Sequence, residues 1–169
     1  MSGQTDTRSL TEMVVLALLV EEPAHGFAVA RQLAPATDLG RVLTVRRPSV
    51  YRALDRLVAA GLAEADGREP GAAGPVRIPH RATAPGRRAV TDWLMQPVDH
   101  IRDIRIELLV KLRLLERSGL DRSGLVDRQR RTLASTLDTL VTDSGDDVVD
   151  RWRHHNAVAA RRFLDDLGS

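Results

Sequence analysis

The 169-residue chain contains no cysteine, a single lysine and few aromatic residues, which make up 3% of the sequence. Without cysteine it can form no disulfide, thiolate metal site or nucleophilic thiol, which agrees with a reducing compartment. The scarcity of aromatic rings argues against a large aromatic cofactor pocket. No apolar run approaches the length of a membrane span, and the polar residues 1–8 contain no apolar segment of a signal peptide. We therefore expect a cytoplasmic protein.

Candidate metal ligands and catalytic residues are also sparse. The histidines are scattered, and no pair combines the i, i+4 spacing of a helical metal site with a third ligand nearby. No glycine-rich phosphate loop follows a predicted strand. The sequence therefore predicts neither an enzyme nor a cofactor or metal site.

Positive charge, by contrast, is present and unevenly distributed. Residues 41–91 contain ten arginines against four acidic residues, whereas residues 101–169 contain thirteen basic and twelve acidic residues. A local surplus of arginine is what a phosphate-binding surface requires. This asymmetry indicates a nucleic-acid partner for the first half of the chain.

One helical pattern, over residues 48–60, lies within this basic segment. Its apolar residues have the spacing of one buried helical face: Val50, Ala53, Leu54, Leu57 and Val58. Ser49, Arg52 and Arg56 fall on the opposite side, with Tyr51 on the flank. We interpret this helix as the recognition helix of a winged helix-turn-helix protein that binds duplex DNA. The alternative is an amphipathic surface helix whose arginines are merely solvated.

The preceding residues supply two further helices. Ser9 to Glu12 reads as a capping box, and the helix that follows is apolar nearly all round, so we expect cover on several faces, including from a second subunit. A shorter helix over residues 25–34 has Phe27, Ala30 and Leu33 among its inward residues. Its pairing with the 48–60 helix predicts the helix-turn-helix unit.

A β-hairpin is predicted after the recognition helix. Its strands are residues 62–65 and 76–82, separated by a loop rich in glycine and proline. Arg68, Arg77 and Arg81 would lie on or near this wing, within reach of backbone phosphates. The next helix begins near Thr83 and ends at Pro97.

Three helical patterns make up the rest of the chain, at residues 103–117, 125–141 and 148–167. Leucine stripes and balanced exposed charge are typical of a helical packing or dimerisation module. The predicted fold is mainly α: a winged helix-turn-helix domain at residues 1–97 and an all-helical dimerisation domain at residues 98–169. The two tryptophans, Trp93 and Trp152, are expected in the core, with the wall of an effector pocket as the alternative.

Short motifs occur in this order: Pro23-Ala24-His25-Gly26-Phe27, Ser49-Val50-Tyr51-Arg52-Ala53-Leu54-Asp55-Arg56-Leu57, Ala60-Gly61-Leu62, Thr83-Ala84-Pro85-Gly86 and Asp92-Trp93-Leu94. In order and spacing they resemble the PadR-type transcriptional regulators. Residues 106–112 and 162–167 are similar to the opening and closing segments of that family's helical C-terminal domain. The chain departs from the family at Phe27, where a tyrosine is usual, and at Pro79-His80, where an aromatic residue is usual.

The resemblance implies a homodimeric repressor that binds an inverted-repeat operator and is released by a small-molecule effector. In this scheme Ser49 and Tyr51 donate to phosphates, and Arg52 and Arg56 face the groove. The residues predicted to bind DNA are Arg46, Arg47, Ser49, Tyr51, Arg52, Arg56, Arg68, Arg77 and Arg81. The candidate effector pocket is assigned to Trp93 and Trp152.

Two alternatives remain open at this stage. One is a different class of winged-helix regulator, in which both chain ends build the dimer, although the separate C-terminal helices argue against it. The other is a helical interaction protein that does not bind DNA. Loss of salt-dependent duplex binding after reversing Arg52 and Arg56 to Glu would favour the DNA-binding reading.

Overall fold

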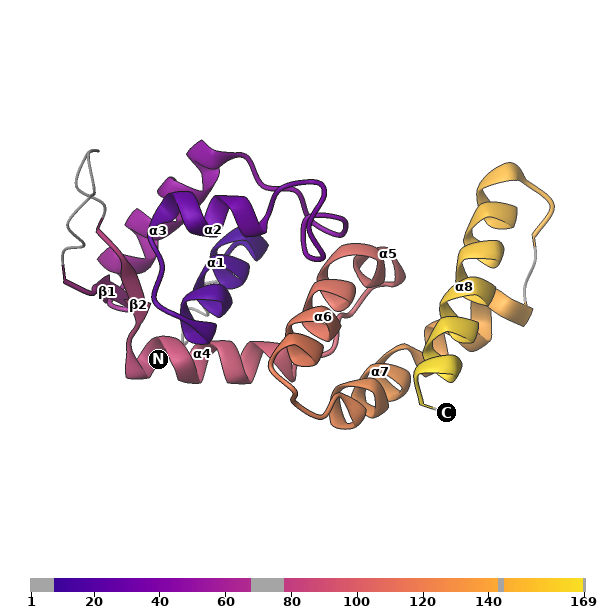
Figure 1. The fold of residues 1–169 in the computed structure, drawn as a ribbon. Helices are drawn as coiled ribbons and strands as arrows, with labels where there is room; N and C mark the ends of the chain where they lie inside the picture. Colours follow the sequence, from indigo (N-terminus) through magenta and orange to yellow (C-terminus); the bar gives the residue numbers. More distant parts are fainter. Residues whose placement is uncertain (1–7, 68–77, 143–144, 169) are drawn as a thin grey trace, which may run out of the picture. The chain divides into compact units, whose positions relative to one another are not determined.

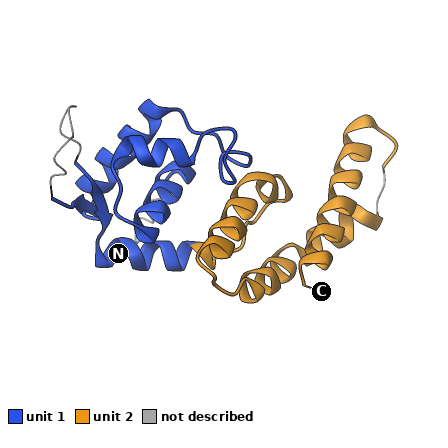
Figure 2. Ribbon diagram, viewed as in Figure 1, with its two compact units in different colours: residues 1–93 blue, residues 94–169 orange. Residues whose placement is uncertain are grey.

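The computed structural model describes residues 8–67, 78–142 and 145–168. The described residues are mainly helical, with one two-stranded antiparallel sheet (Figure 1), as the predicted fold class requires. The chain divides into two compact units, Met1–Trp93 and Leu94–Ser169 (Figure 2). The functional assignment of residues 1–97 to DNA binding and 98–169 to dimerisation stays a prediction.

Helix α1 (Leu10–Glu21) is the centre of the first unit. The Glu12 backbone N–H donates to Ser9 Oγ at 3.3 Å, as the predicted cap requires. Every residue from 13 to 19 is buried within the single chain. The second subunit that was expected to help cover this helix is therefore not needed.

Helices α2 (Gly26–Gln32) and α3 (Arg47–Ala59) form the helix-turn-helix pair. Four of the predicted apolar residues of α3 are buried: Val50, Ala53, Leu54 and Leu57. Val58 is 41% exposed, so its predicted burial is wrong. Val29 in α2 and Leu33 just after it are fully buried, whereas Phe27, which was predicted to face inward, is half-buried.

Gly61 ends α3 and directs the chain into the wing. Its φ is +68°, and Leu62 N–H donates to Leu57 O at 2.9 Å, the pattern of a glycine-terminated helix. Strand β1 (Ala63–Ala65) then pairs with β2 (His80–Ala82) in antiparallel register, Ala63 opposite Ala82.

The far edge of β2 also pairs, which sequence reasoning did not predict. Ala24 and His80 exchange two backbone hydrogen bonds of 2.9 Å, so the turn before α2 is fixed to the wing. Pro79 precedes β2, and its carbonyl accepts from Asp66 N–H at 2.8 Å. Pro79 thus pairs in the hairpin through its carbonyl, which does not require the backbone N–H that proline lacks.

Helix α4 (Ala84–Leu94) packs closely beneath this region. Thr83 Oγ1 accepts from Gly86 N–H at 3.2 Å and donates to Gly61 O at 2.8 Å. A Cβ on Gly86 would lie 2.1 Å from Leu62 O, so only glycine permits the close approach. This contact explains the Thr-x-x-Gly motif. Trp93, near the end of α4, is buried.

The second unit contains α5 (Ile101–Asp103), the π-helix η1 (Ile104–Leu108), α6 (Leu109–Arg117), α7 (Ser123–Thr142) and α8 (Val148–Leu167). The predicted 103–117 helix is therefore interrupted by a π-helical segment. The predicted inward residues Val149 and Trp152 are 58% and 70% exposed, which corrects that prediction. The buried face of α8 is instead Ala157, Ala160 and Leu164. At about 100° per residue, Trp152 lies roughly 120° from the centre of that face.

Residues 95–98 are anchored to α6 and α7. Met95 O accepts a hydrogen bond from Arg128 Nη1 at 3.1 Å. Gln96 O accepts one from Lys111 Nζ at 2.9 Å. The fully buried amide of Gln129 donates to Val98 O at 2.8 Å and accepts from Val98 N–H at 2.7 Å. Lys111, the one lysine in the sequence, is thus a buried structural residue. In the part of the chain that is described, no helix has the length and apolar content to cross a membrane.

Candidate nucleic-acid interface

Helix α3 carries polar and basic side chains on the side opposite its buried residues. Tyr51, Arg52 and Arg56 are exposed, and Ser49 is half-buried. Arg52 Nη2 donates to Ser49 Oγ at 3.1 Å, so these two side chains, one turn apart, are already oriented together. Because its apolar face is fixed in the core, α3 presents this basic face on a rigid support.

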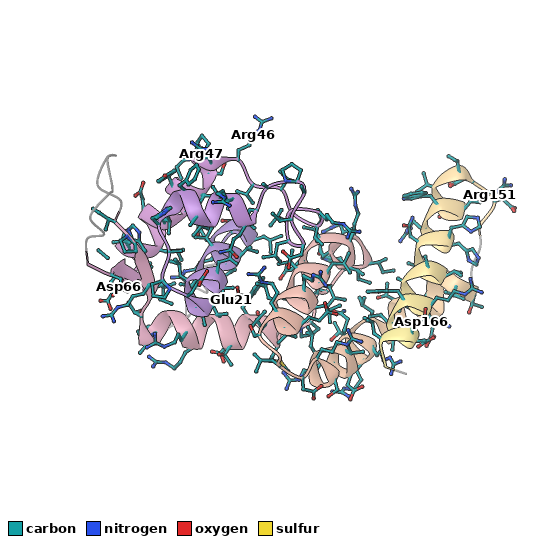
Figure 3. The ribbon with its side chains drawn as sticks, viewed as in Figure 1. Glu21, Arg46, Arg47, Asp66, Arg151 and Asp166 are labelled. Atoms are coloured by element: carbon teal, nitrogen blue, oxygen red, sulfur yellow. The ribbon has the colours of Figure 1, made fainter. Side chains whose placement is uncertain are left out.

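Two further arginines lie at the start of α3. Arg46 occupies the N-cap position and projects away from the ribbon in Figure 3. The Arg47 guanidinium lies over the Phe27 ring, 4.7 Å from its centroid, in a cation–π contact. The aromatic ring of Phe27 therefore contacts an arginine that is predicted to bind DNA.

The His25-Gly26 pair positions α2 against Tyr51. His25 Nδ1 accepts from Ala28 N–H at 3.0 Å and so caps α2, a role that sequence reasoning missed. A Cβ on Gly26 would lie 2.6 Å from Tyr51 Cε1, so the tyrosine ring rests directly on the glycine. The ring packs and the side chain stays 45% exposed, which leaves Tyr51 available at the surface.

Arg56 has a partner that the sequence did not indicate. Its Nη1 lies 2.9 Å from Glu12 Oε1 in α1. The side chain of Arg56 remains 70% exposed, whereas that of Glu12 is 11% exposed. Arg56 is thus directed by a buried acid rather than standing as an independent cation. Reversing Arg56 to Glu would place two carboxylates together, so the double reversal is not a clean test of DNA binding.

A cavity of about 240 Å³ lies between the first turn of α1 and this basic face. It is lined by Ser9, Thr11, Glu12, Ser49, Arg52, Ala53 and Arg56. Hydroxyls, guanidinium groups and the positive end of a helix are the groups that favour a phosphate. The first turn of α1 therefore borders the basic face of α3, which the sequence did not indicate.

Residues 15–92 match the model of the Transcriptional regulator PadR-like family. This chain carries a PadR-like domain. The domain is the DNA-binding winged helix of a transcription regulator. No curated protein sequence matches the chain.

Solved structures of PadR regulators are similar to the whole chain or to part of it. Bacillus subtilis PadR in complex with operator DNA has a TM-score of 0.52 and 16% identity, over 96% of this chain and 94% of that chain. The same protein in complex with p-coumaric acid has a TM-score of 0.44 and 16% identity, over 95% and 96%. A PadR family regulator from Clostridium difficile has a TM-score of 0.42 and 15% identity, over 50% and 82%. The first of these likenesses shows the shared fold.

In the wing of the PadR-like domain, one of the arginines predicted to contact phosphates is paired with acidic residues. Arg81 is exposed, but its Nη2 lies 2.9 Å from Glu64 Oε1 and its Nε lies 3.5 Å from Asp66 Oδ1. Two carboxylates thus compete with phosphate for this arginine. The other predicted wing arginines, Arg68 and Arg77, lie outside the described residues. The contribution of all three to DNA binding stays a prediction.

The two tryptophans differ in their surroundings. Trp93, in the first unit, is buried as expected. Trp152 lines a cavity in the second unit, and Trp93 is not among the residues that line it. The assignment of these tryptophans to an effector pocket stays a prediction for each separately. Among the residues placed in the structure, no three His, Asp or Glu side chains could hold a metal ion together.

Proposed function

We propose that the protein is a cytoplasmic, homodimeric repressor that binds an inverted-repeat operator through α3 and is released by a small-molecule effector. The observation that carries this proposal is the basic face of α3 within a PadR-like domain. The likeness to the fold of B. subtilis PadR, which was crystallised with operator DNA, supports it. No catalytic role is proposed.

The side chains around α3 divide into two groups by the contacts that they can make. Ser49 and Tyr51 carry hydroxyls that donate to phosphates and so fix the register of the helix on the duplex. Arg52 projects from the exposed face, where it can donate to a guanine edge. Arg56 can exchange its contact with Glu12 for one with DNA, so its binding carries the cost of leaving that acid.

Dimerisation is proposed through the second unit. Val148 and Val149, at the start of α8, are 81% and 58% exposed, and a second copy would remove them from water. Two copies related by a two-fold axis would place two α3 helices on half-sites about one helical turn apart. Sedimentation of the V148E/V149E variant tests this: it is expected to remain folded and become monomeric.

The test of DNA binding begins with selection of duplexes from a random library, followed by footprinting of the selected sequence. An inverted repeat is expected. Arg52→Ala should then weaken binding by about 1–3 kcal/mol and lower the slope of log K against log salt by about one. Arg88→Ala is the matched control, because Arg88 is also an exposed arginine but lies on α4.

The outcome at Arg52 decides which face reads DNA. Wild-type affinity in R52A together with weakened binding in R88A would assign recognition to another surface. Failure of the wild-type protein to select any duplex would contradict the proposed function as a whole.

A further inference from the structure

Glu12 is a largely buried acid beside the basic face of α3. Its side chain is 11% exposed, and it lies in the first turn of α1, where residues 13–19 that follow are all buried. Its Oε1 lies 2.9 Å from Nη1 of Arg56, whose side chain is 70% exposed. Because α1 is fixed in the core, this carboxylate stays beside Arg56 even when the guanidinium turns toward DNA. An acid at this place opposes phosphate, so affinity for DNA does not account for it.

Arg52 and Arg56, both exposed on α3, differ in the charge of their partners. Arg52 Nη2 donates to Ser49 Oγ at 3.1 Å, and this neutral hydroxyl leaves the positive charge of Arg52 intact. Arg56 donates to a carboxylate, so the Arg56–Glu12 pair carries no net charge. Both arginines and Glu12 line the same cavity. One surface therefore presents a charged arginine and a neutralised arginine side by side.

The neutralised arginine still has hydrogen-bond donors to offer. A guanidinium carries five N–H groups, and the contact with Glu12 uses one of them. Two of the others are enough for the O6 and N7 acceptors of guanine. The edge of a guanine base is uncharged, whereas each backbone phosphate carries a full negative charge. The Arg56–Glu12 pair therefore keeps its hydrogen bonds to a guanine edge and loses most of its attraction for phosphate.

The Glu12 carboxylate is close enough to act on a phosphate bound by Arg56. Two hydrogen-bond lengths of about 2.9 Å and the width of one guanidinium would separate the phosphate oxygen from Glu12 Oε1, so the two lie within about 8 Å. The Debye length at physiological salt is also about 8 Å, and a largely buried charge is screened less than an exposed one. The repulsion between Glu12 and the phosphate is therefore felt at the working salt concentration.

We infer that Glu12 is a specificity-determining residue of the DNA-binding surface. It cancels the charge of Arg56, so that Arg56 reads a guanine edge and adds little to binding that is independent of sequence. Specificity of this kind comes from a repulsive element as well as an attractive one. Arg52, whose charge is not cancelled, contributes to binding on any sequence. The inference rests on the proposed function, because it requires an operator.

Glu12→Gln tests the cancellation of charge on two duplexes, the operator that the wild type selects and a duplex of random sequence. The substitution frees the charge of Arg56, so one more phosphate contact becomes favourable. Binding to the random duplex should strengthen about fivefold or more at 0.1 M salt, and the slope of log K against log salt should steepen by about one. The operator should gain less, so the ratio of operator affinity to random-duplex affinity should fall.

The double variant E12Q/R56A tests the contact with guanine, because it keeps the net charge of the wild-type pair and removes the guanidinium. It should bind the random duplex with the affinity and salt slope of the wild type, and the operator about tenfold more weakly. Replacing each operator guanine in turn by 7-deazaguanine, which lacks the N7 acceptor, identifies the base. At one position this change should weaken the wild type and leave E12Q/R56A nearly unaffected, which a purely structural role of the pair would not produce.

Asp92→Asn is the matched control for E12Q, because Asp92 is an exposed acid of α4 and its replacement changes the net charge of the protein by the same amount. D92N should bind both duplexes like the wild type. Circular dichroism of each variant checks that the helices are intact.

Several results would overturn the role of Glu12. These are an unchanged salt slope in E12Q, equal strengthening of both duplexes in E12Q, or wild-type operator affinity in E12Q/R56A. A salt slope that is shallower by about one in E12Q/R56A would show that Arg56 contacts phosphate in the wild type, which also overturns it. Failure of the wild type to select any duplex would instead refute the proposed function, while the salt slopes on the random duplex would still decide whether Glu12 cancels the charge of Arg56.

Discussion

Replacing Arg56 by alanine tests whether the first unit depends on the contact between α1 and α3. The substitution leaves the Glu12 carboxylate, whose side chain is 11% exposed, without its cation. We expect R56A to lose stability even though Arg56 itself is largely at the surface. The loss of stability comes from the unpaired, largely buried Glu12 carboxylate and not from the absence of the arginine itself.

The size of the effect follows from the geometry. At the 2.9 Å separation of Nη1 and Oε1, Coulomb's law gives about 1.4 kcal/mol at the dielectric constant of water and about 6 kcal/mol at an effective value near 20. The 70% exposure of Arg56 moves the pair toward the lower figure, and desolvation of Glu12 and side-chain entropy subtract from it. We expect a loss of about 1–2 kcal/mol. Each kcal/mol lowers the melting temperature by about 2–4 °C if the whole chain unfolds together.

Thermal unfolding of R56A, Glu12→Gln and the double variant measures the coupling. E12Q/R56A should recover most of the stability lost in R56A, because neither side chain then carries a charge. E12Q alone should bind duplex more tightly than the wild type, since Arg56 no longer has to leave an acid. A wild-type melting temperature for R56A, together with unchanged duplex affinity for E12Q, would refute this account of the pair.

Three further predictions concern other parts of the chain. Gly86→Ala should destabilise the first unit by about 1–3 kcal/mol, seen in thermal unfolding, because the new Cβ meets a backbone carbonyl at 2.1 Å. Gln129→Leu should cost about 2–4 kcal/mol in urea unfolding, because it leaves the buried N–H and C=O of Val98 without partners. Hydrogen bonds from the Ser123 hydroxyl and backbone lower the pKa of Asp121; NMR titration of Ser123→Ala should show that pKa rising toward its ordinary value.

Local signals account for the features that the sequence predicted well. The cap at Ser9, the glycine end of α3 at Gly61 and the limits of α8 at residues 148–167 each depend on residues within one or two turns. Such signals act through hydrogen bonds and backbone angles of neighbouring residues. They can therefore be read without knowledge of the tertiary fold.

Contacts between elements account for what was missed. Arg56 and Glu12 are 44 residues apart, and helical periodicity shows only that both could be polar. The same periodicity allows Trp152 either inward or outward, because α8 carries apolar residues on more than one face. His25 caps α2 although histidine is not among the preferred capping residues. Each of these three features depends on which helices pack against one another in the tertiary fold.

The anchoring of residues 95–98 has a mechanical consequence. Helix α4 ends at Leu94, and Met95 O already accepts a hydrogen bond from Arg128, so no slack chain lies between the end of α4 and the anchored segment. Residues 95–98 therefore belong structurally to the second unit, and a single peptide bond joins the last residue of α4 to the first anchored carbonyl.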